Sequence, residues 1–152
     1  MRLDGKIAAI TGGGSGIGRA CALAFAQEGA DIAVGDLDFE RASEVSDEVH
    51  ALGGKALAMQ IDVTEQNDLD RFVDGVVEEL GGLSAWVGSA GVSIGATVLD
   101  HTREEWRRLM DLNVDAVVFG AQAAARRMVP NGTGSIINIA SIYGARAVRE
   151  RL

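Results

Sequence analysis

A glycine-rich segment lies between an apolar run and an amphipathic run near the start of the chain. Residues 6–11 (KIAAIT) have the composition of a buried strand, and residues 16–28 have the spacing of a helix. The segment between them, 11–18 (TGGGSGIG), fits the pattern T-G-x-x-x-G-x-G. The plain pattern G-x-G-x-x-G does not fit, because Ile17 stands where its third glycine would fall. A glycine turn from strand to helix is typical of the first unit of an α/β sheet.

The three fixed glycines each have a physical role in such a turn. Gly12 ends the strand in a turn, where glycine tolerates a positive φ. Gly16 has no Cβ, so a pyrophosphate can approach the helix N-terminus, where free N–H groups and the helix dipole favour an anion. Gly18 lets the helix pack closely on the sheet. Ser15 and Ile17 complete this candidate cofactor-binding segment. A glycine turn without a ligand is the alternative, but the position between strand and helix favours nucleotide binding.

Apolar runs and amphipathic segments alternate along the rest of the chain. The predicted strands are 6–11, 31–36, 55–62, 85–89 and 134–140, and the predicted helices are 16–28, 39–52, 65–80 and about 103–128. Strands that are apolar on both sides and alternate with helices indicate a parallel sheet covered on both faces. Right-handed crossovers then make this an α/β fold, a Rossmann-type doubly wound parallel sheet. Thr102 and Glu105 form a capping box ahead of the last helix, and Gly29, Gly53 and Gly81 follow the ends of the three earlier helices.

Asp36 ends the second predicted strand, 20 residues after Gly16. A carboxylate at this position accepts hydrogen bonds from the adenosine ribose hydroxyls and repels a 2′-phosphate. Neither Leu37 nor Ser15 offers a cation to such a phosphate, although Arg19 is near in sequence. We therefore expect NAD as the cofactor in preference to NADP. A solvated aspartate at a strand end is the alternative interpretation.

Asp62 ends the third predicted strand and presents two alternatives. It could face the adenine, as Asp36 faces the ribose. A helix-capping role beside Thr64 is almost as well supported by the sequence.

The charge and composition of the chain exclude several classes of function. The net charge is −8 and no basic stripe is present, so phosphate-backbone binding to nucleic acid has no electrostatic source. No apolar run approaches the length of a membrane span, and no secretory signal precedes the first strand. The single cysteine, Cys21, cannot form an internal disulfide. His50 and His101 are isolated, so no metal site is expected. We predict a soluble, cytoplasmic protein.

With these residues identified, the chain resembles the classical short-chain dehydrogenase/reductase family over nearly its whole length. The matching features, in order, are residues 11–18, Asp36, Asp62-Val63, Gly88-Ser89-Ala90-Gly91, Asn113 and residues 134–141 (GSIINIAS). The resemblance implies that Val63, Ser89, Ala90 and Gly91 also contact the cofactor. Ser89 departs from the family, which usually has asparagine there, but a serine still donates and accepts a hydrogen bond.

The resemblance also implies a chemistry, namely hydride transfer between the nicotinamide and an alcohol or carbonyl carbon of a small-molecule substrate. The family serine that positions the substrate oxygen corresponds to Ser141. The family asparagine that supports a proton-relay water corresponds to Asn113. The alternatives are a strand-end turn residue for Ser141 and a helix-interior residue that bonds backbone for Asn113.

The family's general acid/base is a tyrosine in the motif Y-x-x-x-K, about a dozen residues after the serine. This sequence stops 11 residues after Ser141, its only tyrosine is Tyr143, and the position four residues later is Ala147. The only lysines are Lys6 and Lys55. We therefore expect a single dinucleotide-binding domain over 1–152 that is C-terminally incomplete, with the sheet truncated after its fifth strand.

Such a chain carries the cofactor-binding half of an oxidoreductase and is expected to be inactive alone. The alternatives are a non-catalytic dinucleotide-binding module and an inactive truncated product. Ile136, Ile137 and Ile139 are expected on a poorly covered edge strand. The helix at 103–128 resembles the family's dimerisation helix, which predicts a homo-oligomer.

Overall fold

The computed structural model describes residues 1–97 and 99–144, and its elements follow the predicted order. The strands are β1 (Ile7–Thr11), β2 (Asp31–Asp36), β3 (Ala56–Gln60), β4 (Ala85–Gly88) and β5 (Ser135–Asn138). The α-helices are α1 (Gly16–Gln27), α2 (Phe39–Ala51), α3 (Gln66–Leu80), α4 (Arg103–Met110) and α5 (Ala116–Met128). A π-helical segment, η1 (Asp111–Asp115), joins α4 to α5, and two short 3-10 helices, η2 (Val129–Asn131) and η3 (Ile142–Gly144), flank β5.

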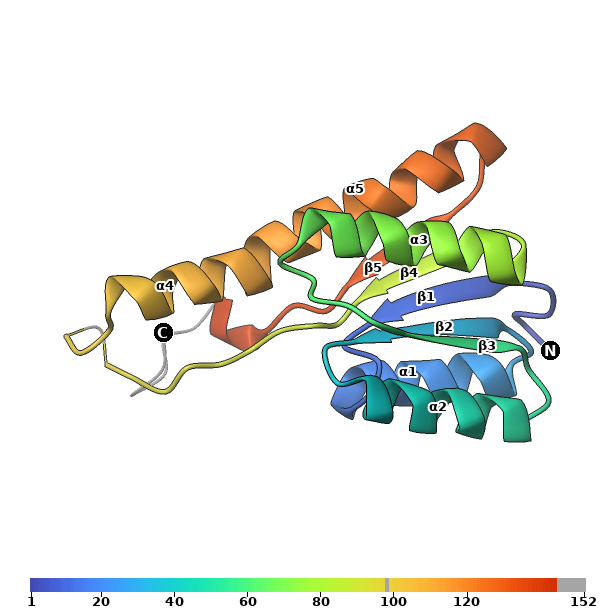
Figure 1. Ribbon diagram of the computed structural model, residues 1–152, viewed down its shortest axis with the longest axis horizontal. Coiled ribbons are helices and arrows are strands. Elements are labelled where there is room, and N and C mark those ends of the chain that lie inside the picture. Colours follow the sequence, from blue (N-terminus) through green and yellow to red (C-terminus); the bar gives the residue numbers. More distant parts are fainter. Residues whose placement is uncertain (98, 145–152) are drawn as a thin grey trace.

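The five strands form one parallel sheet in the order β3-β2-β1-β4-β5. The chain runs outward from β1 to β3, then crosses to β4 on the other side of β1. Figure 1 shows α1 and α2 on one face of this sheet and α3 and α5 on the other. The predicted doubly wound α/β fold is therefore confirmed. The reversal of direction between β1 and β4 is the place where such sheets bind ligands.

Two apolar clusters, one on each face of the sheet, form the core. Alternate residues of a strand point to opposite faces, so Ala8 and Ile10 of β1 join the cluster under α1 and α2, whereas Ala9 joins the cluster under α3 and α5. Trp86 on β4 is 1% exposed and contacts Phe72 of α3, with ring centroids 6.1 Å apart. These buried side chains hold β1, β2 and β4 in place beneath the carboxyl edge of the sheet.

The predicted helix at 103–128 is confirmed as one helical run, α4–η1–α5, in which the hydrogen-bond pattern changes over five residues. The predicted capping box is present, since Thr102 accepts from the Glu105 N–H and Glu105 accepts from the Thr102 N–H. The α-helical hydrogen-bond pattern is then interrupted by the π-helical η1. Glycines end the earlier helices as predicted, with φ of +94° at Gly29, +90° at Gly53 and +93° at Gly81.

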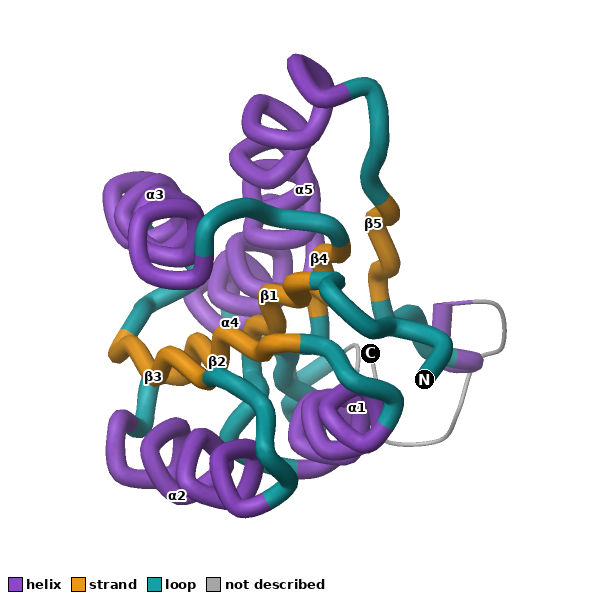
Figure 2. Tube along the Cα trace, turned by 90° about the vertical axis from the view of Figure 1, so that its right-hand side faces the viewer, coloured by secondary structure: helices purple, strands orange, loops and turns teal. Residues whose placement is uncertain are grey.

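β5 is the exposed end of the sheet. Its four residues are all exposed, with Ile136 at 40% and Ile137 at 39%. Ile139, just after the strand, packs partly against the cluster under α1 and α2. In the view of Figure 2, β5 lies at the outer end of the sheet, beyond β4. The predicted poorly covered edge strand is therefore confirmed for Ile136 and Ile137. None of the helices in the described residues is both long enough and apolar enough to span a membrane.

Candidate dinucleotide-binding site

A cleft of about 360 Å³ opens at the carboxyl edge of the sheet, above the reversal between β1 and β4. It brings together eleven of the twelve residues predicted to bind a cofactor: Gly12, Ser15, Gly16, Ile17, Asp36, Leu37, Asp62, Val63, Ser89, Ala90 and Gly91. These residues come from four separate segments of the chain. The twelfth predicted residue, Gly18, does not line the cleft.

The geometry of the turn explains why its glycines are required. Gly12 has φ +63°, and a Cβ there would lie 2.8 Å from the backbone of Ala90. Gly16 has φ +52°, and in the described part of the chain no heavy atom beyond its own neighbours and helix backbone lies within 4 Å of where its Cβ would be. Gly18 is buried against the carbonyl oxygen of Gly12, which a Cβ would strike. Gly18 thus supports the turn from behind rather than packing the helix on the sheet, and Gly16 leaves open space at the cleft.

The N-terminus of α1 faces this space without a capping side chain. Ser15 occupies the N-cap position but makes no side-chain cap hydrogen bond, and the first turn carries no acidic residue. At the N-terminus of α2, by contrast, Asp38 accepts hydrogen bonds from the N–H groups of Glu40 and Arg41. The first-turn N–H donors of α1 and the positive end of its dipole are therefore available to an anion from outside the helix.

Asp36 is held at the rim of the cleft by two backbone hydrogen bonds. Its Oδ2 accepts from the Gly14 N–H at 2.9 Å, and its Oδ1 accepts from the Asp38 N–H at 3.1 Å. The bond to Gly14 spans 22 residues and joins the glycine turn to the end of β2. The carboxylate therefore has a fixed position beside the helix N-terminus, which a freely solvated strand-end aspartate would not have.

Asp62 takes part in a local turn as well as lining the cleft. Its Oδ1 accepts from both the N–H and the Oγ1–H of Thr64, at 2.9 and 2.7 Å. The Asp62 N–H in turn donates to Asp68 Oδ2 at 2.9 Å, and this bond is the main reason that the pKa of Asp68 lies below its usual range. The side chain of Asp62 thus fixes the turn before α3, although Glu65 is the N-cap residue.

Ser89 and Ala90 form the wall of the cleft at the end of β4. The Ser89 N–H donates to Thr11 Oγ1 at 3.3 Å, and the Thr11 side chain is buried at 3% exposure. This bond fixes the end of β4 against the end of β1, directly beside the glycine turn. It uses the backbone of Ser89, so a serine in place of asparagine leaves it intact.

Asn113 lies in the π-helical segment and binds the loop that follows β4. Its Oδ1 accepts from the Val92 N–H at 2.9 Å, and its Nδ2 donates to the Val92 carbonyl oxygen at 2.8 Å. The side chain therefore bonds backbone, as in the alternative interpretation, but the backbone of a segment 21 residues away. This pair of bonds attaches η1 to the cleft wall at Val92.

Ser141 lies after β5 and is exposed. Its Oγ accepts from the Tyr143 N–H at 3.2 Å, a local turn hydrogen bond at the start of η3. Ser141 is not among the residues that line the cleft, and Tyr143 is 46% exposed. Asn113 and Ser141, the two residues predicted to be catalytic, thus lie on separate segments. Ile139 is the cleft residue nearest to Ser141 in sequence.

Sequence reasoning missed four residues that line the cleft: Ile61, Val92, Leu112 and Ile139. Ile61 and Ile139 each stand one residue before the end of a predicted strand, so the rule that parallel strands present their carboxyl ends at one edge would have found them. Val92 directly follows the predicted Gly91. Leu112 carried no local signal, because it lies in a helix and reaches the cleft through tertiary packing.

Within the described ranges, no three histidine, cysteine or carboxylate side chains lie together as a metal site would require. The donor set instead fits a dinucleotide. The cradle at Gly16 is open where a side chain would fill it, the N-terminus of α1 has no cap, and a fixed carboxylate stands beside it. These groups suit a pyrophosphate flanked by a ribose.

The fold and this cleft define a dinucleotide-binding α/β protein, and the sequence comparison gives its family. Residues 6–151 match the family model described as short chain dehydrogenase. The chain therefore belongs to the short-chain dehydrogenase/reductase family.

Curated relatives of the chain are dehydrogenases. It is 41% identical over 143 residues to a 2,5-dichloro-2,5-cyclohexadiene-1,4-diol dehydrogenase of Sphingobium indicum, covering 94% of this chain and 57% of the relative. It is 38% identical over 142 residues to the 7alpha-hydroxysteroid dehydrogenase of Escherichia coli, covering 93% of this chain and 55% of the relative. The chain thus spans little more than half the length of these relatives.

Solved structures show the same relation. A short-chain type dehydrogenase/reductase from Mycobacterium marinum superposes with a TM-score of 0.94 at 41% identity, over 98% of this chain and 59% of that protein. A 7 alpha-hydroxysteroid dehydrogenase, in complex with NADH and 7-oxo glycochenodeoxycholic acid, superposes with a TM-score of 0.93 at 36% identity. That match covers 98% of this chain and 58% of the steroid dehydrogenase.

Proposed function

We propose that the residues around the cleft form the NAD(H)-binding part of an oxidoreductase that acts on an alcohol or carbonyl group of a small molecule. The observation that carries the proposal is the fixed carboxylate of Asp36 beside the open cradle at Gly16, in one cleft. When bound, the dinucleotide supplies or accepts a hydride at its nicotinamide. The residues of this chain bind and orient it.

The roles follow from the geometry of the cleft. The backbone at Ser15, Gly16 and Ile17 holds the pyrophosphate at the uncapped N-terminus of α1. Asp36 accepts hydrogen bonds from the adenosine ribose, with Leu37 beside it.

Two further segments complete the cleft. Asp62 and Val63 lie along the adenine side, and Ser89, Ala90 and Gly91 form the wall at the end of β4. Gly12 and Gly18 keep the turn compact behind the site.

The arrangement of the arginines supports NAD over NADP. Arg19, the cation nearest to the turn in sequence, forms two hydrogen bonds to Glu48 of α2, at 3.2 and 2.6 Å. Its guanidinium is thereby directed along α2. A 2′-phosphate would meet the carboxylate of Asp36 while Arg19 is already paired.

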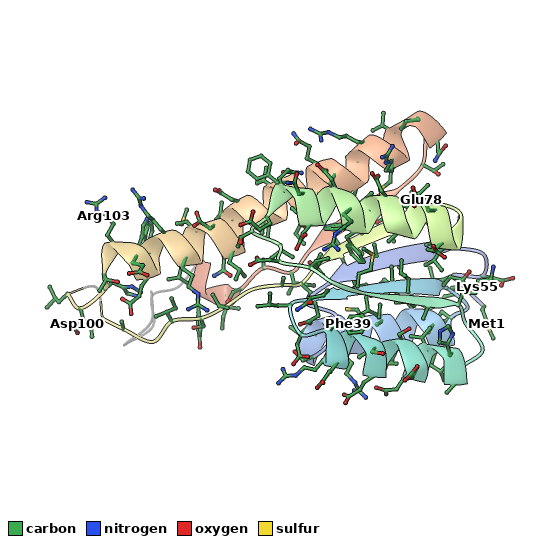
Figure 3. The ribbon with its side chains drawn as sticks, in the orientation of Figure 1. Met1, Phe39, Lys55, Glu78, Asp100 and Arg103 are labelled. Carbon is green, nitrogen blue, oxygen red and sulfur yellow. The ribbon has the colours of Figure 1, made fainter. Side chains whose placement is uncertain are left out.

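Acid–base catalysis has to come from groups beyond this cleft. The two lysines precede β1 and β3 and so lie at the amino edge of the sheet, as Figure 3 shows for Lys55. The cleft lies at the carboxyl edge. We therefore propose that the 152 residues bind the cofactor as a single domain and do not reduce a carbonyl by themselves. Asn113 and Ser141 would serve the reaction only beside a tyrosine and lysine.

Self-association and location are further parts of the proposal. Trp106, Val114, Val118 and Phe119 on α4–η1–α5 are 41% to 56% exposed, and Val114 and Val118, four residues apart, share one side of the helix. We propose that this surface pairs two copies of the chain in the cytoplasm. Sedimentation of the wild-type chain and of Val118→Glu tests the pairing, and a wild-type monomer at all concentrations would contradict it.

Titration with NADH and NADPH, followed by cofactor fluorescence, tests the central proposal. We expect NADH to bind more tightly than NADPH, and Asp36→Asn to reduce this preference by roughly tenfold, since a single charge and a charge-assisted hydrogen bond are removed. Tighter binding of NADPH by the wild type would contradict the role of Asp36. NADH-dependent carbonyl reduction above background, abolished by Ser141→Ala, would contradict the proposed inactivity of the isolated chain.

A further inference from the structure

A second cleft adjoins the cofactor cleft at Asp36 and Leu37. It has a volume of about 610 Å³ and is lined by Asp36, Leu37, Asp38, Phe39, Glu40, Arg41 and Gln60. Figure 3 shows Phe39 at the start of α2, at the end of the sheet opposite Met1 and Lys55. An adenosine ribose bound to Asp36 would therefore stand where the two clefts meet, because Asp36 lines both of them.

Arg41 is the only cation among the described residues that line the second cleft, and it stands close to Asp36. The position that a Cβ of Gly14 would take is 2.8 Å from Arg41 Cβ and 2.9 Å from Asp36 Oδ2. The base of the arginine side chain and the ribose-binding carboxylate thus both contact the glycine turn at one point. An arginine so placed would be expected to attract a 2′-phosphate.

The guanidinium of Arg41 is occupied by Asp38, however. Arg41 Nε lies 3.1 Å from Asp38 Oδ2, while the other oxygen of Asp38, Oδ1, accepts from the N–H groups of Glu40 and Arg41 at the start of α2. Because the helix-cap hydrogen bonds fix the Asp38 carboxylate, it is already in position to bind the guanidinium of Arg41. Three carboxylates, those of Asp36, Asp38 and Glu40, share the cleft with this one arginine.

We infer that Asp38 is a positioning residue for cofactor choice, which acts by withholding Arg41 from the 2′ position of the adenosine ribose. Asp36 repels a 2′-phosphate directly, and Asp38 denies it the nearest guanidinium. This inference rests on the proposed NAD(H) site. It predicts that the two aspartates act together, because removing either one alone leaves the other barrier in place.

The test measures NADH and NADPH affinity of the full 152-residue chain by fluorescence titration, for Asp36→Asn, Asp38→Asn and the double variant. Asparagine at position 38 keeps the helix cap and removes the charge. We expect Asp38→Asn alone to change NADPH affinity by less than about threefold, and the double variant to exceed the product of the single effects by roughly tenfold. The gain in NADPH affinity should fall as the salt concentration rises, because salt screens the attraction between an exposed arginine and a phosphate.

Two further variants identify the cation and control for net charge. Arg41→Gln, added to the double variant, should remove the gain in NADPH affinity. Asp47→Asn, an equal charge change at an exposed position of the same helix, should leave the NADPH to NADH ratio unchanged. Circular dichroism of each variant establishes that α2 is intact.

Each outcome has a separate meaning. A double variant whose effect is only the product of the single effects overturns the role of Asp38. A gain that survives Arg41→Gln but is lost with Arg19→Gln assigns the cation to Arg19 and also overturns it. Folded wild-type protein that binds neither cofactor overturns the proposed function, and the inference with it.

Discussion

β2 and β5 are both parallel strands rich in β-branched residues, yet the chain buries them very differently. Ile32 and Val34 of β2 are fully buried, whereas Ile136 and Ile137 of β5 are about 40% exposed. β2 lies between β1 and β3 and beneath α1 and α2, whereas β5 pairs only with β4 among the described strands. The comparison shows that an apolar run predicts a strand, while the layers around that strand decide how much its side chains stabilise the fold.

The same contrast extends to the site. The glycine turn follows β1 and Asp36 ends β2, both of which have strand neighbours on each side, and the bond from the Gly14 N–H to Asp36 Oδ2 joins them across 22 residues. Ser141 follows β5, and the bond at its Oγ is local. The sheet therefore preorganises the cofactor side of the cleft. It preorganises the segment after β5 to a lesser degree.

Matched isoleucine substitutions give the largest expected difference between the two regions. Ile32→Ala removes a side chain with no solvent exposure and leaves a cavity, so it should lower the free energy of unfolding by about 3 kcal/mol. Ile137→Ala removes a side chain that is already 39% exposed and should cost about 1 kcal/mol or less. Urea unfolding followed by circular dichroism measures both.

Equal costs for the two variants would break the comparison, because they would mean that β5 is covered in solution. Repeating the measurement over a range of protein concentrations distinguishes the causes. A cost of Ile137→Ala that grows with concentration would indicate a second copy of the chain on β5.

Two glycine-to-alanine substitutions distinguish the effect of a steric clash with nearby backbone from the effect of a positive φ alone. In Gly18→Ala, the new Cβ strikes the carbonyl of Gly12 and lies 3.0 Å from Gly13 Cα, so the turn must shift. We expect a loss of about 2 kcal/mol in stability and a more than tenfold loss of NADH affinity. Gly132→Ala, next to η2, has φ +68° with open space around it and should cost about 1 kcal/mol with no change in NADH affinity.

NADH affinity that survives Gly18→Ala would show that the turn can relax without losing the site. Both quantities come from the same samples, by thermal unfolding and fluorescence titration.

Periodicity and turn chemistry predicted the fold well in the part that the sheet buries. The strands, the glycine-terminated helices and the capping box at Thr102 depend on short-range signals, and these were identified. The meeting of the glycine turn, Asp36, Asp62 and Ser89 in one cleft also followed, because all of them come after parallel strands.

Contacts between distant side chains and backbone were not predictable. The π-helical segment η1 within the long helix accompanies the bonds from Asn113 to Val92, and the pairing of Arg19 with Glu48 joins two helices. Neither has a signature in the local pattern of residues. The second cleft was missed for the same reason, since it depends on how Arg41 lies against Gly14.

Two asparagine substitutions compare side chains that bond backbone on either side of α5. Asn113→Ala removes both hydrogen bonds to Val92, so it should cost about 1 to 2 kcal/mol and expose the Val92 N–H to solvent. Asn131→Ala, near β5, removes one bond to the Arg127 carbonyl at 3.3 Å and should cost less than about 0.5 kcal/mol. Amide hydrogen exchange at Val92 is the decisive measurement, and unchanged protection in Asn113→Ala would contradict the attachment.

The smallest expected effect is a pH dependence at Asp68. The N–H of Asp62 and the nearby Arg71 hold the pKa of this carboxyl below its usual range, against the opposing effect of partial burial. A lowered pKa stabilises the folded state above the unfolded-state pKa, near 4, and that contribution is lost as the pH falls through the folded-state pKa. Asp68→Asn should therefore be less stable than wild type by under about 1 kcal/mol at pH 7, given solvent screening, with the difference vanishing in acid.

Glu105 provides the matching case beyond the sheet, since the N–H of Thr102 lowers the pKa of its carboxyl in the same direction. Urea midpoints of wild type, Asp68→Asn and Glu105→Gln, measured from pH 7 down to pH 3, compare how much each of the two carboxyls stabilises the folded state. Asp68 fixes the turn after β3, on the well-packed side of the sheet, whereas Glu105 caps a helix that extends past the sheet (Figure 1). The pH-dependent difference in unfolding free energy between wild type and variant should therefore be larger for Asp68→Asn. A larger difference for Glu105→Gln would mean that α4 unfolds together with the rest of the molecule more than its position past the sheet indicates.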